Sequence, residues 1–323
     1  MLIDGKWSEN WQPIQKQDQQ GRFIRQPSSV RNWITADGRP GPTGIGGFKA
    51  EADRYHLYIA LICPWASRTL AVRALKKLEN LISVSIVSPV MTDQGWRFGN
   101  FSGATVDHLY QSDYLHQLYT RHDPHFTGRA TVPVLWDKRQ NCMVNNESAD
   151  IMRMLNAAFS KLSVSCTDLY PLSLQAEIAT LNQQIYEQLN NGVYRAGFAG
   201  SQQAYNEAYR DVFTCLDDLE LRLQKGPLGP FLFGAQLTET DIRLFVTLIR
   251  FDVAYFSLFK CNQRRIADYP HLNRYLAALY AHPDLRGTVN FSHIKQGYYS
   301  IKKLNPSGIV PQGPEIDLFA QAS

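Results

Sequence analysis

The chain has 323 residues, more than one ordinary hydrophobic core holds, and its 44% hydrophobic content is ample for two domains. Its net charge of +4 arises without any lysine and arginine run, so nothing indicates a nucleic-acid partner. The sequence shows no secretory signal and no membrane-spanning apolar run, and its five widely spaced cysteines fit a reducing compartment, which together predict a cytoplasmic protein with no membrane partner.

Residues 1–50 are rich in glutamine, glycine and proline, and they end in the glycine and proline run 38–47. Such a composition holds no regular element, so we predict an N-terminal arm followed by a linker. The arm carries more large apolar side chains than a solvated tail would, and we expect it to pack across the domain behind it. These side chains are Trp7, Trp11, Phe23, Ile24, Trp33 and Ile34.

A cysteine stands where a strand is predicted to become a helix. Residues 55–62 alternate aromatic and β-branched side chains, which is typical of a half-buried strand, and Pro64 suits the first position of a helix over 65–78. Cys63 is therefore predicted at a helix N-terminus, where free backbone N–H groups and the helix dipole stabilise a thiolate and lower the thiol pKa. The alternative is that Cys63 is a small buried hydrophobic residue, as many free cysteines are.

The residue three positions after this cysteine decides how a mixed disulfide could be released. A disulfide oxidoreductase of the Cys-x-x-Cys type has its resolving cysteine there, whereas this chain has Ala66. A lone thiolate can form a mixed disulfide but cannot release it, so it needs an external thiol. Glutathione is the abundant candidate, and we predict it as a co-substrate, with no bound cofactor.

The following segments predict a β-α-β unit and then a long insertion. Residues 81–87 alternate as a strand does, which implies a parallel pair with a right-handed crossover. The insertion spans 91–129, and we predict a helix within it near 107–119. His122 and His125 lie in this insertion, but their spacing matches no established set of metal ligands, so we predict no metal site.

A proline enters the next predicted strand, over 131–136. Its missing N–H is tolerated near a strand start, or is useful if the Val132–Pro133 bond is cis. A Val-Pro bond of this kind, downstream of the Cys63 turn, favours the thioredoxin fold, in which the residue before the proline offers its backbone to the cysteinyl part of a bound peptide. The alternative is an ordinary edge-strand proline.

A further helix is predicted to begin at Ser148, which is a good N-cap candidate. Such a helix start binds a carboxylate, and Glu147 beside it could accept a hydrogen bond from an ammonium group. The pair suits the zwitterionic end of a γ-glutamyl peptide. The alternative is a capped helix with no ligand.

A linker is predicted over 156–174, and beyond it the apolar spacing is helical throughout, which indicates an all-α second domain. Thr238 and Asp241 form a capping box before an apolar helix that should be the core of this domain. An irregular tail follows from residue 301. The predicted helices cover 175–191, 201–225, 238–260 and 270–282.

A cysteine turn of the thioredoxin type, a Glu-Ser helix start and an all-α domain with a Thr-x-x-Asp cap together resemble cytosolic glutathione transferases. Within that superfamily, four segments look like the Xi class, the glutathionyl-hydroquinone reductases. The similarity covers roughly residues 20 to 312. The four segments are 63–66 (CPWA), 145–148 (NNES), 190–199 (NNGVYRAGFA) and 291–295 (FSHIK).

The resemblance implies a role for particular residues. Cys63 would be the nucleophile and Tyr194 the acid/base, while Tyr255 and Tyr298 would donate hydrogen bonds to the thiolate and the substrate. Tyr299 adjoins Tyr298 and is the alternative to it. Glutathione would be held by Trp96, Arg129, Ala130, Thr131, Val132, Glu147 and Ser148.

We therefore predict an α/β thioredoxin-like domain followed by an all-α domain, with a homodimer through the helical domain implied by the resemblance. The predicted activity is reduction of glutathionyl-hydroquinones to hydroquinones through a Cys63–glutathione mixed disulfide, with release of glutathione disulfide. The alternatives are an omega-like thiol transferase or dehydroascorbate reductase, and a non-catalytic transferase-like binding module. The predicted boundaries are 1–50 for the arm and linker, 51–160 for the first domain, 175–300 for the second and 301–323 for the tail.

Overall fold

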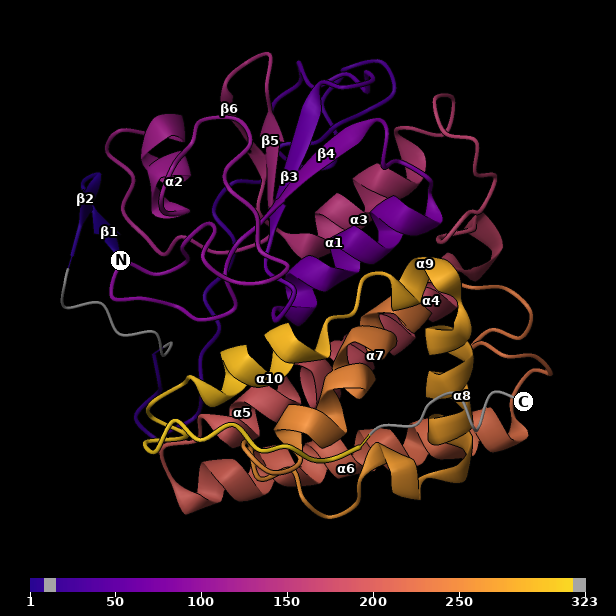
Figure 1. The fold of residues 1–323 in the computed structure, drawn as a ribbon. Coiled ribbons are helices and arrows are strands. Elements are labelled where there is room, and N and C mark those ends of the chain that lie inside the picture. Colours follow the sequence, from indigo (N-terminus) through magenta and orange to yellow (C-terminus); the bar gives the residue numbers. More distant parts are fainter. Residues whose placement is uncertain (9–15, 316–323) are drawn as a thin grey trace. The chain divides into compact units, whose positions relative to one another are not determined.

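The computed structural model describes residues 1–8 and 16–315, so Trp11 of the predicted arm and residues 316–323 of the predicted tail lie outside the described residues. The chain divides into two compact units, whose elements are labelled in Figure 1. The described residues of the first unit come from Met1–Pro13, Pro27–Thr167 and Thr288–Gly297, and those of the second from Ile14–Gln26, Asp168–Gly287 and Tyr298–Ser323.

A four-stranded mixed sheet with helices forms the first unit. Its elements are β1 (Leu2–Ile3), β2 (Lys6–Trp7), β3 (Tyr55–Ile59), α1 (Pro64–Leu75), β4 (Ile82–Ile86), α2 (His116–His122), β5 (Val134–Asp137), β6 (Cys142–Asn145) and α3 (Ser148–Ala157). The sheet order is β4-β3-β5-β6, with β4 parallel to β3 and the other pairs antiparallel. The predicted β-α-β unit is confirmed, α1 and α3 lie side by side (Figure 1), and β6 is an element that the sequence pattern did not reveal.

The central strand β3 differs from its prediction in length and in burial. It ends at Ile59 instead of Ile62, and all of its residues are buried instead of every second one. Full burial is possible because both ring nitrogens of His56 have partners, Ser83 Oγ at 2.7 Å and Ser85 Oγ at 2.9 Å. Burial lowers the pKa of His56 to about 3, so this ring is neutral in the folded protein.

Two helix predictions in this unit need correction. Helix α1 begins at Pro64 as expected but ends at Leu75 instead of Leu78, because Lys77 takes a left-handed conformation with φ of 51°. The helix predicted over 107–119 is wrong. There the carboxylate of Asp107 accepts hydrogen bonds from nearby backbone N–H groups and stabilises turns, and helix α2 begins only at residue 116.

The N-terminal arm packs on the first unit over residues 27–50, as predicted. Ile34 and Phe48 are buried there. The backbone N–H of Asn32 donates to the carbonyl of Val144 in β6 at 2.9 Å, so the arm is tied to the edge of the sheet. This part of the arm is therefore a component of the folded unit.

Helices form the second unit, as predicted. They are α4 (Gln175–Gln184), α5 (Gly192–Gly197), α6 (Gln202–Lys225), α7 (Glu239–Arg250), α8 (Pro270–Ala281) and α9 (Pro283–Arg286), with 3-10 turns at Leu172–Leu174 and Ile266–Asp268 and π-helical turns at Ile185–Asn190 and Phe251–Tyr255. The predicted helices correspond to α4, α6, α7 and α8, and the π-helical turns extend α4 and α7. Across the described part of the chain, no helix is long and apolar enough to cross a membrane.

Helix α7 is the core of the second unit, and every one of its residues is buried. The carboxylate of Asp241 at its start accepts hydrogen bonds from the N–H and the hydroxyl of Thr238, both at 2.8 Å. It also accepts from the N–H of Leu232 and the hydroxyl of Tyr275, both at 2.9 Å. The predicted cap residues are therefore also a buried junction between α7, α8 and the loop before α7.

One segment belongs to a different unit from the one predicted. Thr288–Gly297 was expected in the helical domain, yet it clusters with the first unit, so helix α10 (Phe291–Tyr299) contributes residues to both. Within the first unit, His293 Nε2 lies 2.8 Å from the carbonyl oxygen of Ser102. Gly297 lies so close to Ile62 that a Cβ at this position would approach Ile62 Cδ1 to 2.3 Å. These contacts explain the assignment.

Candidate active site

Cys63 occupies the N-cap position of α1, as predicted. Its backbone is extended, with φ of −76° and ψ of 117°, and Pro64 takes the first helical position. The N–H of Ser67 donates to the carbonyl of Cys63 at 2.9 Å, which closes the first helical turn. The Cys63 side chain is half-buried, so its sulfur is held at a helix N-terminus without being sealed in the core.

The carbonyl of Val132 lies beside this thiol. The distance from Cys63 Sγ to Val132 O is 3.8 Å, and the Val132–Pro133 bond is cis. Ala66, in the position of a resolving cysteine, is buried within α1. The structure thus brings together the predicted nucleophile and the residue expected to meet the cysteinyl part of a peptide.

Three other cysteines are unsuited to act as thiolates at neutral pH. Burial raises the pKa of Cys142 to about 11 and those of Cys215 and Cys261 to about 12. Cys166 is exposed. Among the buried and half-buried cysteines, Cys63 alone lies at a helix N-terminus.

The cap of α3 is Glu147, and the prediction that Ser148 caps this helix is wrong by one residue. Glu147 is extended and its carboxylate accepts a hydrogen bond from the N–H of Ala149 at 3.2 Å, while Ser148 is the first helical residue. A Glu side chain can replace Ser here because it is long enough to fold back over its own helix start. Both residues remain at the anion-binding end of α3.

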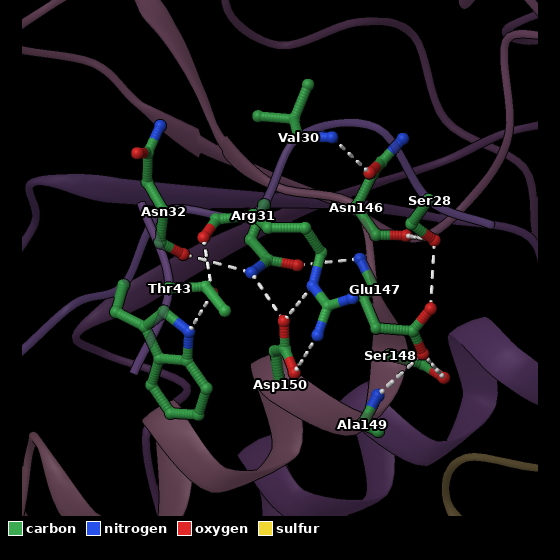
Figure 2. A network of polar contacts seen from close by, with 12 residues as sticks. Ser28, Val30, Arg31, Asn32, Thr43, Asn146, Glu147, Ser148, Ala149 and Asp150 are labelled. Carbon is green, nitrogen blue, oxygen red and sulfur yellow. Dashed lines mark hydrogen bonds and ion pairs between the residues drawn. The ribbon is translucent and has the colours of Figure 1, made fainter. Parts of the chain in front are cut away.

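Residues of the N-terminal arm hold this helix start in place, and sequence reasoning missed them. The hydroxyl of Ser28 donates to Glu147 Oε2 at 2.9 Å, and Arg31 pairs with Asp150 through its Nε and Nη2 atoms (Figure 2). The N–H of Val30 donates to Asn146 Oδ1 at 3.1 Å. The arm therefore fixes the segment that was predicted to bind the glutamyl end of glutathione.

The remaining predicted glutathione residues also lie in the first unit. Trp96 is half-buried in the insertion, and its carbonyl accepts from the N–H of Leu115 at 2.9 Å. Arg129, Ala130 and Thr131 are half-buried and lead into Val132. The charge of Arg129 contributes, after burial, to lowering the pKa of the N-terminal amine to about 6.

The two histidines weighed as metal ligands have protein partners. His122 Nδ1 accepts from the N–H of Met143 at 3.3 Å, and His125 Nδ1 lies 2.7 Å from the carboxylate of Asp4. Within residues 1–8 and 16–315, no group of three His, Cys, Asp or Glu side chains is placed to hold a metal ion.

Three tyrosines meet in the second unit. The hydroxyl of Tyr298 lies 2.6 Å from that of Tyr194 and 2.7 Å from that of Tyr255. Tyr299 is directed elsewhere, because its hydroxyl lies 2.5 Å from Ser257 Oγ. The cluster that the resemblance implied therefore contains Tyr298, and the adjoining Tyr299 is not part of it.

Burial keeps two members of this cluster, Tyr255 and Tyr298, protonated. Tyr255 and Tyr298 are nearly inaccessible, and burial raises the pKa of each well above 10, whereas Tyr194 is half-buried. The ring of Phe259 lies against all three, with centroid distances of 5.4 Å to Tyr194, 5.1 Å to Tyr255 and 5.6 Å to Tyr298. The guanidinium of Arg25 lies over the Tyr194 ring at 5.0 Å. Phe259 and Arg25 are supporting residues that the sequence did not reveal.

Comparisons with known proteins agree with this architecture. Models of the glutathione S-transferase N-terminal and C-terminal domains match residues 62–158 and 202–278. The chain is 53% identical to glutathionyl-hydroquinone reductase YqjG of Escherichia coli, over 98% of this chain and 96% of that protein.

Solved structures are similarly close. The glutathione-bound structure of YqjG has a TM-score of 0.89 and 51% identity, over 98% of this chain and 96% of that one. The glutathione S-transferase Xi of Phanerochaete chrysosporium has a TM-score of 0.87 and 46% identity, over 93% and 95%. The chain therefore belongs to the glutathione S-transferase family and, within it, to the Xi class.

Proposed function

We propose that the protein reduces glutathionyl-hydroquinones to hydroquinones, with glutathione as the reductant. The observation that carries the proposal is the half-buried Cys63 thiol at the start of α1, 3.8 Å from the Val132 carbonyl and without a second cysteine three residues on. A relative that is 53% identical is named for this activity. No metal or prosthetic group takes part in the proposed reaction.

The proposed reaction has two thiol exchanges. In the first, the Cys63 thiolate attacks the sulfur of the conjugate, a sulfur–sulfur bond forms, and the carbon–sulfur bond breaks with its electron pair going to the ring. Hydroquinone leaves, and Cys63 remains as a mixed disulfide with glutathione. In the second, a glutathione thiolate attacks this mixed disulfide, releasing glutathione disulfide and restoring the Cys63 thiolate.

The first exchange needs a leaving group better than an aryl carbanion. A hydroquinone ring provides one, because a ring hydroxyl can tautomerise to a ketone while the carbon bearing sulfur takes up a proton. Departure from this tautomer gives an enolate, which is the phenolate of the hydroquinone. We assign the proton transfer to Tyr194, with Tyr255 and Tyr298 donating hydrogen bonds to the developing charge.

Glutathione itself is assigned to one set of residues in the first unit. The helix start at Glu147 and Ser148 suits the zwitterionic glutamyl end, because the positive end of the helix dipole favours a carboxylate there and Glu147 can accept from an ammonium group. The carbonyl of Val132 suits the cysteinyl N–H. Trp96, Arg129, Ala130 and Thr131 complete the proposed site, and a solved relative is described as glutathione-bound.

Turnover of three substrates tests the proposal. A glutathionyl-hydroquinone and a simple glutathione mixed disulfide should both be reduced, whereas S-phenylglutathione, which has no ring hydroxyl, should be inert. Steady reduction of S-phenylglutathione contradicts the tautomer mechanism. Reduction of the mixed disulfide alone indicates an omega-like thiol transferase, and no turnover of any of the three indicates a binding module.

We also propose that the protein is cytoplasmic and forms a homodimer through its helical domain. Light scattering coupled to gel filtration tests the dimer by measuring the mass of the particle in solution. A dimer has twice the mass of the 36.8 kDa chain. A monomer at micromolar concentration contradicts the dimer. Cell fractionation tests the location.

A further inference from the structure

The hydroxyl of Tyr119 lies between the two chain segments proposed to bind glutathione. Tyr119 belongs to α2 in the long insertion and is fully buried. Its hydroxyl donates to the carbonyl of Thr131 at 2.8 Å and accepts from the N–H of the same residue at 3.1 Å. It also accepts from Asn146 Nδ2 at 3.3 Å and lies 3.3 Å from the hydroxyl of Thr131. Thr131 directly precedes Val132, and Asn146 directly precedes Glu147.

These contacts use the hydroxyl both as a donor and as an acceptor. The two partner segments lie 12 and 27 positions from Tyr119 in the sequence, so the chain itself does not fix their spacing. The buried hydroxyl oxygen of Tyr119 fixes this spacing, because it bonds to both segments. Burial also raises the pKa of Tyr119, so the hydroxyl keeps its proton and its donor bond.

The side chain of Asn146 connects this hydroxyl to the N-terminal arm. Its Oδ1 accepts from the N–H of Val30 at 3.1 Å (Figure 2). Its Nδ2 faces Tyr119, and its own N–H donates to the carbonyl of Val30 at 3.1 Å. The insertion and the arm therefore meet at the residue before Glu147. Both lie outside the sheet, and both bond to the start of α3.

Helix α2 is itself anchored, so Tyr119 has a fixed position. Trp7 of the β1–β2 hairpin stacks on His116 at the start of α2, with ring centroids 4.6 Å apart. Phe126, beyond the end of α2, meets the Tyr119 ring edge-on at 5.0 Å, and its carbonyl accepts from the N–H of Gly5 at 3.0 Å. The β1–β2 hairpin therefore contacts the insertion on both sides of Tyr119, and Tyr119 bonds to the segments that contain Thr131 and Asn146.

We infer that Tyr119 is a positioning residue for glutathione, through which the insertion sets the spacing of the Thr131–Val132 and Asn146–Ser148 segments. The inference rests on the proposed glutathione site and gives the insertion a purpose within it. Removing the hydroxyl leaves the N–H and carbonyl of Thr131 and the amide of Asn146 without their partner, so both segments relax. Glutathione binding then weakens by roughly tenfold, which is the scale of one net buried hydrogen bond.

Calorimetric titration with glutathione in a Cys63→Ala background measures this effect. Tyr119→Phe should raise the Kd for glutathione by roughly tenfold. The matched control is Tyr58→Phe, because Tyr58 is equally buried and its hydroxyl donates to Asp107 of the same insertion at 2.9 Å without touching either segment. The control should lower Tm comparably and leave the Kd unchanged. Ser148→Ala tests the glutathione site itself and should also raise the Kd.

A second readout uses the intact thiol. In Tyr119→Phe with Cys63 present, KM for glutathione should rise while kcat at saturating glutathione stays near the wild-type value, a division that general destabilisation does not produce. Asn146→Asp keeps the acceptor for Val30 but cannot donate to Tyr119, so it should shift the Kd in the same direction. It provides a second route if Tyr119→Phe folds poorly.

The outcomes separate this inference from the proposed function. If Ser148→Ala weakens binding but Tyr119→Phe and Asn146→Asp do not, the glutathione site stands and the positioning role is overturned. An equal rise in Kd for Tyr58→Phe overturns it as well, because general destabilisation then explains the result. If Ser148→Ala binds glutathione normally, the proposed site is wrong and the inference fails with it.

Discussion

The thiol turn of the first unit and the tyrosine cluster of the second are built in opposite ways. The thiol turn is local, since residues 55–67 form the strand, the turn and the first helical turn that place Cys63. The tyrosine cluster joins residues as far as 104 positions apart, and its contacts are between side chains. A helix N-terminus is made by the backbone alone, whereas a group of hydroxyls must be assembled by tertiary packing.

The two regions also differ in exposure, and this difference follows from their proposed tasks. Cys63 is half-buried, as a sulfur that must reach a substrate has to be. Tyr255 and Tyr298 are buried deeply enough that their pKa values lie well above 10, so they keep their protons as hydrogen-bond donors. Tyr194 is half-buried and is therefore the most exposed member of the cluster.

The largest effect should come from the thiol. Cys63→Ala and Cys63→Ser should each lower turnover by roughly 10³-fold or more, because no other group forms the mixed disulfide. Calorimetry should show that Cys63→Ala still binds glutathione. Cys166→Ser is the control, since Cys166 is exposed and far along the chain from the turn. Substantial turnover by Cys63→Ala, or equal harm from Cys166→Ser, contradicts the assignment.

The tyrosine cluster should show a smaller effect that depends on the substrate. Tyr194→Phe should slow glutathionyl-hydroquinones by roughly 10²-fold, the usual scale for one acid/base group, and Tyr298→Phe should act in the same direction. Neither should slow a simple glutathione mixed disulfide much, because its leaving group is already a thiolate. Steady-state assays of each variant measure kcat/KM for the glutathionyl-hydroquinone and for the mixed disulfide, and the ratio of the two values is compared with that of the wild type.

Tyr299→Phe is the matched control for Tyr298→Phe. The two residues are neighbours on α10, but the hydroxyl of Tyr299 bonds to Ser257 and not to the cluster. It should therefore leave the ratio of the two substrates unchanged. If Tyr194→Phe slows both substrates equally, the tyrosine supports the thiol or the fold, and the proposed division of tasks between the two regions is wrong.

The contrast between local and assembled regions explains what the sequence could predict. Pro64 after Cys63 is a local helix signal, and it located the thiol correctly. The start of α3 was predicted within one residue, but the choice of Glu147 over Ser148 as its cap depends on how a long side chain folds back and on the arm residue Ser28 beside it. Such contacts have no local signature.

Assembled features were found by resemblance or were not found. The tyrosine cluster was identified because the segment 190–199 resembles a known class, since no spacing rule connects Tyr194 with Tyr298. Tyr119 gave no signal, because its partners lie far away in the sequence and α2 itself was misplaced. The turn at Asp107 replaced the predicted helix through side-chain bonds to the backbone, which apolar periodicity does not detect.

The last effect is on stability, not on turnover, and it concerns the pH dependence of the first unit. The pKa of His56 is about 3 in the fold because of burial, against about 6.5 in an unfolded chain. Its neutral form therefore stabilises the fold above pH 6.5, and this contribution is lost as the pH falls towards 3. The slope is at most about 1.4 kcal/mol per pH unit. The cluster residues Tyr255 and Tyr298 stay protonated throughout this range and add no slope.

Urea unfolding at several pH values between 7 and 4 measures this slope. His56→Gln should show a shallower loss of unfolding free energy on acidification than the wild type, because the titrating group is gone. His125→Gln is the exposed control. Asp4 raises the pKa of His125, so the contribution of His125 to the pH dependence of stability has the opposite sign to that of His56, and solvent screens it. Parallel curves for the wild type and His56→Gln contradict the prediction.

The central claim is that Cys63 takes the glutathionyl group while the ring leaves as hydroquinone, and one mass measurement tests it directly. The enzyme is mixed with one equivalent of a glutathionyl-hydroquinone in the absence of free glutathione, and both the protein and the released small molecule are analysed. We predict one glutathionyl group on Cys63 and one equivalent of hydroquinone, with glutathione disulfide appearing only after glutathione is added. Release of hydroquinone from an enzyme whose Cys63 stays unmodified would contradict the account.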